Sequence, residues 1–140
     1  MVIFLILLNL VFFLTTVLSG GFSLPVLLRL GAKYGPLIIS GEWQRLLLCM
    51  FLHGSVWHLF FNMYALFNLG RLAEGVYGAK KLFIIYIVTG ICGSLLSLVV
   101  NYSQVGVGAS GAIFGLAGAL FSSGIKYRNT SLNRLARSLL

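Results

Sequence analysis

Four long apolar runs dominate the sequence and constrain its fold more than any other feature. They cover residues 2–18, 56–73, 82–100 and 110–125. Each is close to the ~20 residues that an α-helix needs to cross a bilayer. Strands of a membrane β-barrel alternate polar and apolar residues, which these runs do not. With 59% hydrophobic and 9% charged residues, the chain is predicted to be one all-α domain, a polytopic bundle with four transmembrane spans.

The first run, residues 2–18, has a competing interpretation as a cleaved signal peptide. A signal peptide has a basic segment before its apolar core and a cleavage site of small residues after it. The sequence has no basic residue before this run and no such cleavage site before Ser19. We therefore interpret the run as the first spanning helix.

Basic residues between and after the runs indicate the orientation. They are Arg71, Lys80 and Lys81 in a short polar connection, residues 70–81, which overlaps the end of the second run, and Lys126, Arg128, Arg134 and Arg137 after the fourth run. The positive-inside rule assigns both groups, the N-terminus and the basic tail (residues 126–140) to the cytoplasmic side. Arg29, Lys33 and Arg45 lie in the connection on the opposite side of the membrane, so they reduce the difference in positive charge between the two sides. The chain is expected to be a multi-pass protein of a bacterial plasma membrane.

The net charge of +8 raises the question of a nucleic-acid partner. The basic residues flank the apolar runs and do not form a patch, which argues against such a partner. We expect membrane lipids as the surroundings and no nucleic acid.

A long connection, residues 19–45, follows the first run. Connections of this length are usually functional or mobile, and its apolar content predicts a position in or on the membrane interface. Glu42 and Arg45 stand at its end. They either brace the connection or are plain interfacial charges, and the sequence leaves both interpretations open.

Ser110 lies among small residues where a polar loop meets the fourth run. Glycines at 106, 108, 111 and 115 surround it. A serine becomes a nucleophile when a base takes its proton and hydrogen-bond donors await the oxyanion. Gly111 and Gly115 are also spaced as a helix-packing pair, so the motif alone is weak evidence for catalysis.

The length of the fourth run predicts the depth of Ser110. From Ser110 to Ile125 the helix spans about 24 Å at ~1.5 Å per residue, less than the ~30 Å of the hydrocarbon layer. Ser110 would then lie below the external surface, preceded by non-helical backbone. Such backbone must be buried in protein or line a wet cavity.

Three polar residues near the start of the second run are expected at the same depth. Asn62 follows His58 by one helical turn, so the two side chains share a face. Both can donate toward an oxyanion near Ser110, and the Ser110 backbone N–H at a helix start adds a third donor. The alternative is that His58 and Asn62 hold neighbouring helices together. For His53, a hydrogen bond to residues 19–45 is favoured over catalysis.

The two cysteines do not indicate a metal site. Cys49 lies in an apolar stretch, residues 46–69, that includes most of the second run, and Cys92 lies in the third run. Their spacing is not that of metal ligands, so both are interpreted as buried small hydrophobic residues. We expect no metal and no cofactor.

These motifs together resemble the rhomboid intramembrane serine proteases, over about residues 31–121. The matching segments are Gly41-Glu-Trp-Gln-Arg45, Phe51-Leu-His-Gly-Ser-Val-Trp-His58, Phe61-Asn-Met-Tyr-Ala-Leu66 and Gly108-Ala-Ser-Gly-Ala-Ile-Phe-Gly115. The resemblance implies that Ser110 is the nucleophile and that His58 and Asn62 line the oxyanion hole. It also implies that Gly108 shapes the serine loop, that His53 and Arg45 support the external connection, and that Gly111 and Gly115 pack the serine helix.

The family resemblance implies a six-helix core without metal or cofactor, which cuts single-pass membrane proteins near the external face. Its Ser–His dyad takes the base from a later helix, whereas the two histidines here, His53 and His58, match other family positions. The base is therefore expected outside these 140 residues, and these residues alone are expected to be nearly inert. The alternative is a non-catalytic rhomboid-like protein that binds transmembrane helices. A channel or transporter is disfavoured, because neither inverted repeats nor mid-span carboxylates occur.

Overall fold

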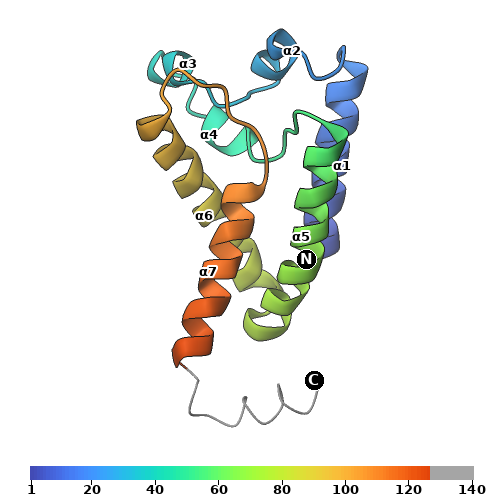
Figure 1. Cartoon of the computed structure of the whole chain (residues 1–140), viewed down its shortest axis with the longest axis vertical. Helices are drawn as coiled ribbons and strands as arrows, with labels where there is room; N and C mark the ends of the chain where they lie inside the picture. Colours follow the sequence, from blue (N-terminus) through green and yellow to red (C-terminus); the bar gives the residue numbers. More distant parts are fainter. Residues whose placement is uncertain (127–140) are drawn as a thin grey trace.

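The computed structural model describes residues 1–126 and is built from helices (Figure 1). In chain order they are α1 (Val2–Leu18), α2 (Leu24–Arg29), α3 (Gly35–Ile39), α4 (Arg45–Leu48), α5 (Val56–Tyr77), α6 (Ala79–Val100) and α7 (Ser110–Lys126). Extended pairing among the described residues is limited to one antiparallel bridge between Lys33 and Gly106. The all-α prediction is confirmed. The predicted basic tail lies outside the described residues, apart from Lys126 at its start.

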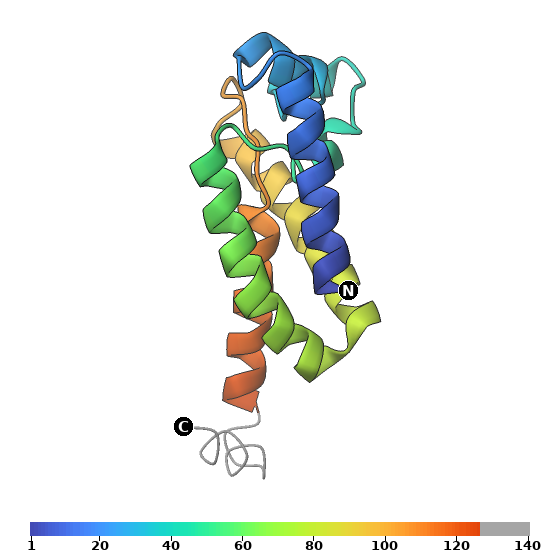
Figure 2. The same ribbon diagram turned by 90° about the vertical axis from the view of Figure 1, so that its right-hand side faces the viewer.

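The four long helices run along the long axis of the molecule (Figures 1 and 2). The short helices α2, α3 and α4 gather at one end, together with residues 101–109 and the start of α5. We call this the loop end. Helix α7 begins farther from the loop end than α5 does, so its first residue is set back from that surface.

The helix boundaries differ from expectation in two connections. The long connection after α1 contains three short helices, and α2 and α3 each have a proline in the first turn, where its missing N–H costs nothing. The polar connection expected at residues 70–81 is almost entirely helical, because α5 continues to Tyr77 and α6 starts at Ala79. Gly78 alone makes the turn, with a φ of 79° that glycine adopts without strain.

A single apolar core holds the long helices together. Leu5 of α1, Leu66 of α5, Tyr86 of α6 and Leu116 of α7 are all fully buried in it. Asn9 of α1 is a fully buried polar residue, and its amide lies 3.4 Å from the Tyr86 hydroxyl. This pair links α1 to α6 across the core.

Helices α6 and α7 approach closely because glycines line their contact. A Cβ on Gly93 would lie 3.2 Å from the Cα of Gly111, and a Cβ on Gly115 would collide with Thr89. Small residues allow this approach, which is typical of helix packing in membranes. The contact sets the position of α7, and with it that of Ser110.

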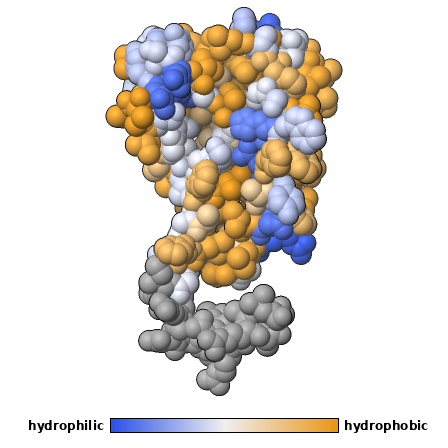
Figure 3. Space-filling model, in the orientation of Figure 1, coloured by the Kyte–Doolittle hydropathy of each residue, from blue (hydrophilic) through white to orange (hydrophobic). Residues whose placement is uncertain are grey.

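The face of the molecule in Figure 3 carries large hydrophobic areas with hydrophilic patches between them. Large side chains such as Val99 (81% exposed) and Phe114 (76% exposed) point away from the protein. An apolar surface of this extent is found where lipid or another helix covers a protein.

Among the described residues, α6 is the one helix both long and apolar enough to cross a membrane, with a mean hydropathy of 2.4. Helix α1 and the apolar part of α7 are shorter than the usual span. Helix α5 has the length, but polar residues such as His58, Asn62 and Asn68 interrupt its apolar sequence. The prediction of four spans therefore stays a prediction.

The two cysteines lie in different environments. Cys49 is buried as predicted, whereas Cys92 is exposed, so the expectation of two buried thiols was wrong for Cys92. The reason is the packing of α6, which turns Gly90 and Gly93 toward its neighbours and leaves Cys92 on another face.

Candidate functional site

Ser110 is the first residue of α7 and its side chain is exposed. Ala109 precedes it as a fully buried residue whose carbonyl accepts the first helical hydrogen bond, from Ile113 N at 3.0 Å. The N–H groups in the first turn of a helix have no partner within the helix. Ser110 therefore combines a free hydroxyl with a backbone donor at a positive helix end.

The backbone before Ser110 is non-helical and is held by other loops. Gly106 and Lys33 exchange two backbone hydrogen bonds of 2.9 Å, and Gly108 N donates to Cys49 O at 2.9 Å. Gly106 and Gly108 also line a cavity of about 160 Å³ that Ser110 borders. This non-helical backbone is thus bound to protein and lines a cavity, which is what non-helical backbone within a membrane requires.

A second pocket, of about 370 Å³, lies between α5 and α7 and contains the predicted polar set. Ser110 borders it from α7, and His58 and Asn62 border it from α5. Its other lining residues are mostly apolar: Phe61, Ala65, Leu69, Ile113, Phe114 and Ala117. The structure therefore brings together three of the four residues that the sequence placed at one depth, and His53 is not among the lining residues of this pocket.

Gly108 positions the His58 ring beside this pocket. Its φ is 117°, which non-glycine residues rarely adopt. A Cβ at this position would lie 2.6 Å from His58 Nε2, so the ring rests on the bare backbone of Gly108. Both the conformation and the space require glycine.

Asn62 is held by its own helix and keeps a donor available. Its Nδ2 donates to the His58 carbonyl at 2.8 Å, and the side chain is 7% exposed. Because an amide nitrogen carries two hydrogens, one remains free for a ligand in the pocket.

His53 lies in the loop before α5 and differs from expectation in its contacts. Its ring is fully buried, and Nδ1 lies 3.2 Å from the carbonyl of Phe51, while Nε2 has no partner among the described residues. The expected hydrogen bond to residues 19–45 is absent. The ring instead packs edge-on to His58, with centroids 5.1 Å apart. Burial, and next the proximity of His58, lower the pKa of His53 to about 4.

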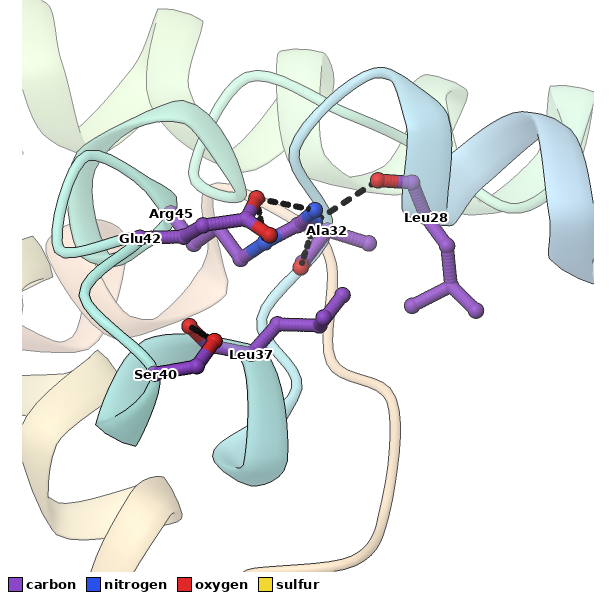
Figure 4. A network of polar contacts seen from close by, with 6 residues as sticks. All are labelled: Leu28, Ala32, Leu37, Ser40, Glu42 and Arg45. Carbon is purple, nitrogen blue, oxygen red and sulfur yellow. Dashed lines mark hydrogen bonds and ion pairs between the residues drawn. The ribbon is translucent and has the colours of Figure 1, made fainter.

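Arg45 braces the long connection after α1, as Figure 4 shows. Its guanidinium donates to the carbonyls of Leu28 (2.7 Å) and Ala32 (3.0 Å) and binds Glu42 Oε2 at 2.6 and 2.9 Å. The side chain is 6% exposed, so the alternative of a plain interfacial charge was wrong for Arg45. In the same segment Ser40 Oγ donates to Leu37 O at 2.8 Å.

Lys33 is a residue that sequence reasoning missed. The sequence indicates only a basic residue of the long connection, but Lys33 is 2% exposed and lines the smaller cavity with Ser110. Burial lowers the pKa of its ammonium. A usable signal was its position in an apolar connection between two glycines, Gly31 and Gly35, that let other backbone approach.

The described residues contain no group of three His, Cys, Asp or Glu side chains that could hold a metal ion. Cys49 lies in the wall of the smaller cavity, with Sγ 3.2 Å from Ser94 Oγ. Burial raises the pKa of this thiol, which keeps it protonated at neutral pH.

Comparison with known proteins identifies the family. A rhomboid domain profile matches residues 40–140. The chain is 38% identical to the rhomboid protease GluP of Bacillus subtilis over 131 residues, which cover 94% of the chain and 26% of that protein. It is 41% identical to RHOMBOID-like protein 5 of Arabidopsis thaliana over 104 residues, 73% of the chain and 34% of the relative.

A bacterial protease of Providencia stuartii, AarA, is 39% identical over 108 residues, 66% of the chain and 38% of its own length. The chain thus spans between about a quarter and two fifths of these curated relatives. The match includes the segments that carry Arg45, His58, Asn62 and Ser110. This chain belongs to the rhomboid family, whose members are membrane proteins.

Proposed function

We propose that the full-length protein is an intramembrane serine endopeptidase that cleaves membrane-anchored substrates near the external face. The observation that carries this proposal is the shared pocket, which Ser110, His58 and Asn62 line from two different helices. The membership of the chain in a family that includes proteases supports the same chemistry.

In the proposed reaction, Ser110 Oγ attacks the scissile carbonyl carbon and loses its proton to a base. The base is proposed to be a histidine outside these 140 residues, because His53 is buried against the Phe51 carbonyl and His58 lies among the donors. The carbonyl oxygen becomes an oxyanion. Three donors would stabilise it: His58, the free hydrogen of Asn62 and the backbone N–H of Ser110.

The tetrahedral intermediate then collapses, and the C–N bond breaks. The leaving amine takes the proton from the base, and an acyl-enzyme forms on Ser110. A water molecule, deprotonated by the same base, hydrolyses this ester and regenerates the serine. The exposure of Ser110 and the two cavities beside it support access of both substrate and water.

The proposed partners are single-pass transmembrane proteins, with lipid around the apolar surface. A substrate helix must partly unwind to present a peptide bond, because a helical carbonyl is hydrogen-bonded within its own segment. The pocket between α5 and α7 is lined by apolar side chains such as Phe61 and Phe114, which suit an apolar segment entering from the bilayer.

The proposal is tested with a fluorophosphonate probe, which reacts with activated serines. The full-length protein in detergent should be labelled, and the Ser110→Ala variant should not. Substitution of Ser103, an exposed serine in the loop before Ser110, is the matched control and should leave labelling unchanged. Equal labelling of wild type and Ser110→Ala would exclude Ser110 as the nucleophile.

A second candidate function is a rhomboid-like protein that binds transmembrane helices without cutting them. The observation that favours it is that His53 is buried against the Phe51 carbonyl and His58 is assigned as an oxyanion donor, so neither is left for the role of base. It predicts an unlabelled full-length protein that still binds a transmembrane helix in a pull-down from detergent.

A further inference from the structure

Lys33 is a buried cation at the loop end that the proposed reaction does not use. Its Nζ donates to Ser97 O (3.2 Å), to Ser97 Oγ (3.2 Å) and to Asn101 O (2.9 Å). An ammonium has three hydrogens, so these acceptors use all of them. Removing an ammonium from water is costly unless such partners replace it. The side chain is therefore fixed in place and acts as a structural link.

Two of these acceptors are carbonyls at the end of α6. Ser97 lies in the last turn of the helix, and Asn101 is its C-terminal cap. Ser97 O also accepts the backbone N–H of Asn101 at 2.9 Å, and Asn101 O accepts that of Gln104 at 3.2 Å, so the ammonium is an additional donor to each carbonyl. The negative end of a helix favours such a cation. Lys33 thus stabilises the place where α6 ends and the loop to Ser110 begins.

The main chain of Lys33 holds the same loop closer to Ser110. Its N–H and C=O each bond to Gly106 at 2.9 Å. The aliphatic part of the Lys33 side chain lies against the same glycine: a Cβ added to Gly106 would lie 3.2 Å from Lys33 Cε. The next contact along this pairing is Gly35 N to Tyr102 O, at 3.0 Å.

Lys33 is also coupled to the brace around Arg45. The guanidinium binds the carbonyl of Ala32, the residue directly before Lys33. Arg45 therefore holds Ala32 close to Leu28 within the connection after α1. Lys33, the next residue, holds the same segment to the end of α6 and to Gly106 in the loop before Ser110. A continuous set of hydrogen bonds connects the two cations to Gly106.

We propose that Lys33 is a positioning residue for Ser110. It holds the loop of residues 101–109 at two points, Asn101 and Gly106, so that Ser110 faces the pocket that contains His58 and Asn62. This inference rests on the proposed role of Ser110 as the nucleophile. Reaction rates depend steeply on such placement, and a shift of about 1 Å can reduce a rate by on the order of a hundredfold.

The structural arm of the test compares Lys33→Met with Lys80→Met in the full-length protein. Methionine keeps the stem and removes the ammonium, and Lys80 is an exposed lysine in the first turn of α6. Hydrogen–deuterium exchange of residues 101–109 should be at least tenfold faster in Lys33→Met and unchanged in Lys80→Met. Exchange in α5 should match wild type in both. Unchanged exchange in residues 101–109, or equal acceleration throughout α5 and α6, would overturn the inference.

The kinetic arm measures fluorophosphonate labelling of Ser110 and cleavage of a transmembrane substrate. Lys33→Met should lower the labelling rate and kcat by on the order of tenfold to a hundredfold, with KM within twofold. Lys33→Arg keeps the charge and donors and should recover most of the loss. A raised KM with unchanged kcat, or no recovery by arginine, would contradict the positioning role.

The two arms separate this inference from the proposed function. If wild-type Ser110 is not labelled at all, the protease proposal fails, and the exchange measurement still decides whether Lys33 orders the loop. If wild type is labelled and Lys33→Met reacts at the same rate, the protease proposal stands and the role of Lys33 is refuted.

Discussion

His58 and Gly108 depend on each other for their positions. The imidazole lies against the backbone of Gly108, which has no side chain and a positive φ that other residues rarely adopt. His53 packs edge-on to the same imidazole, with its pKa lowered to about 4. Small changes at either neighbour would therefore move the donor that the proposed oxyanion needs.

The lowered pKa of His53 makes a prediction about stability. An exposed histidine titrates near pH 6.5, so between about pH 6.5 and pH 4 the unfolded chain binds a proton that the folded chain does not. The free energy of unfolding should fall as the pH decreases through this window, by at most about 3 kcal/mol, and be independent of His53 above it.

His53→Gln should remove this part of the pH dependence, because glutamine does not titrate. Thermal unfolding in detergent at pH 7.5, 5.5 and 4.5 measures it. His58 faces His53, so the difference between the two proteins reports the titration of His53 together with its coupling to His58. Identical pH profiles would show that His53 is not held neutral by burial.

At the scale of elements, the contact between α6 and α7 decides where Ser110 lies along the bundle. Gly93, Gly111 and Gly115 bring the two backbones together, and Thr89 fills the space beside Gly115. Thr89 Oγ1 donates to Ile85 O at 2.7 Å, so it cannot turn away without losing that bond. A larger residue at Gly115 would push α7 outward.

Gly115→Ala should therefore destabilise the protein by about 1–3 kcal/mol through overpacking. Gly118→Ala in the same helix is the matched control, since a Cβ there meets nothing within 4 Å. It should be neutral or slightly stabilising, because alanine favours helices more than glycine does. Thermal unfolding in detergent compares the two, and equal effects would contradict the close packing of α6 on α7.

At the scale of the whole molecule, the candidate site and the turn at Gly78, which Lys80 and Lys81 follow, lie towards opposite ends of the bundle. Helices α2, α3 and α4 form the loop end, while Gly78 makes the turn between α5 and α6 at the other (Figure 1). Lys80 and Lys81 are exposed beside that turn. If the positive-inside rule applies, the loop end and Ser110 face outward.

This orientation predicts a pattern of cysteine accessibility. In a background without Cys49 and Cys92, Trp43→Cys at the loop end should react with a membrane-impermeant maleimide in intact spheroplasts. Lys80→Cys should react after permeabilisation alone. The reverse pattern would place the proposed active site on the cytoplasmic side. Both native side chains are exposed, so neither substitution disturbs the core.

The sequence by itself determined the four long helices and three residues of the candidate site. Apolar runs predicted α1, α5, α6 and α7 closely, because a helix in an apolar environment is dictated by its own residues. The one-turn spacing of His58 and Asn62 predicted a shared face, and both border the pocket with Ser110. These features depend on residues close together in the sequence, so they can be predicted without knowing where distant segments pack.

The tertiary structure alone decided how the loops hold Ser110. Lys33 bonds to residues more than sixty positions away, and Arg45 binds carbonyls of Leu28 and Ala32 that carry no side-chain signal. Any residue type supplies a backbone carbonyl, so no sequence pattern identifies the acceptors of a buried cation. The same limit explains the misjudged contacts of His53 and the exposure of Cys92. Which carbonyls and faces meet is set by the packing of helices far apart in the chain.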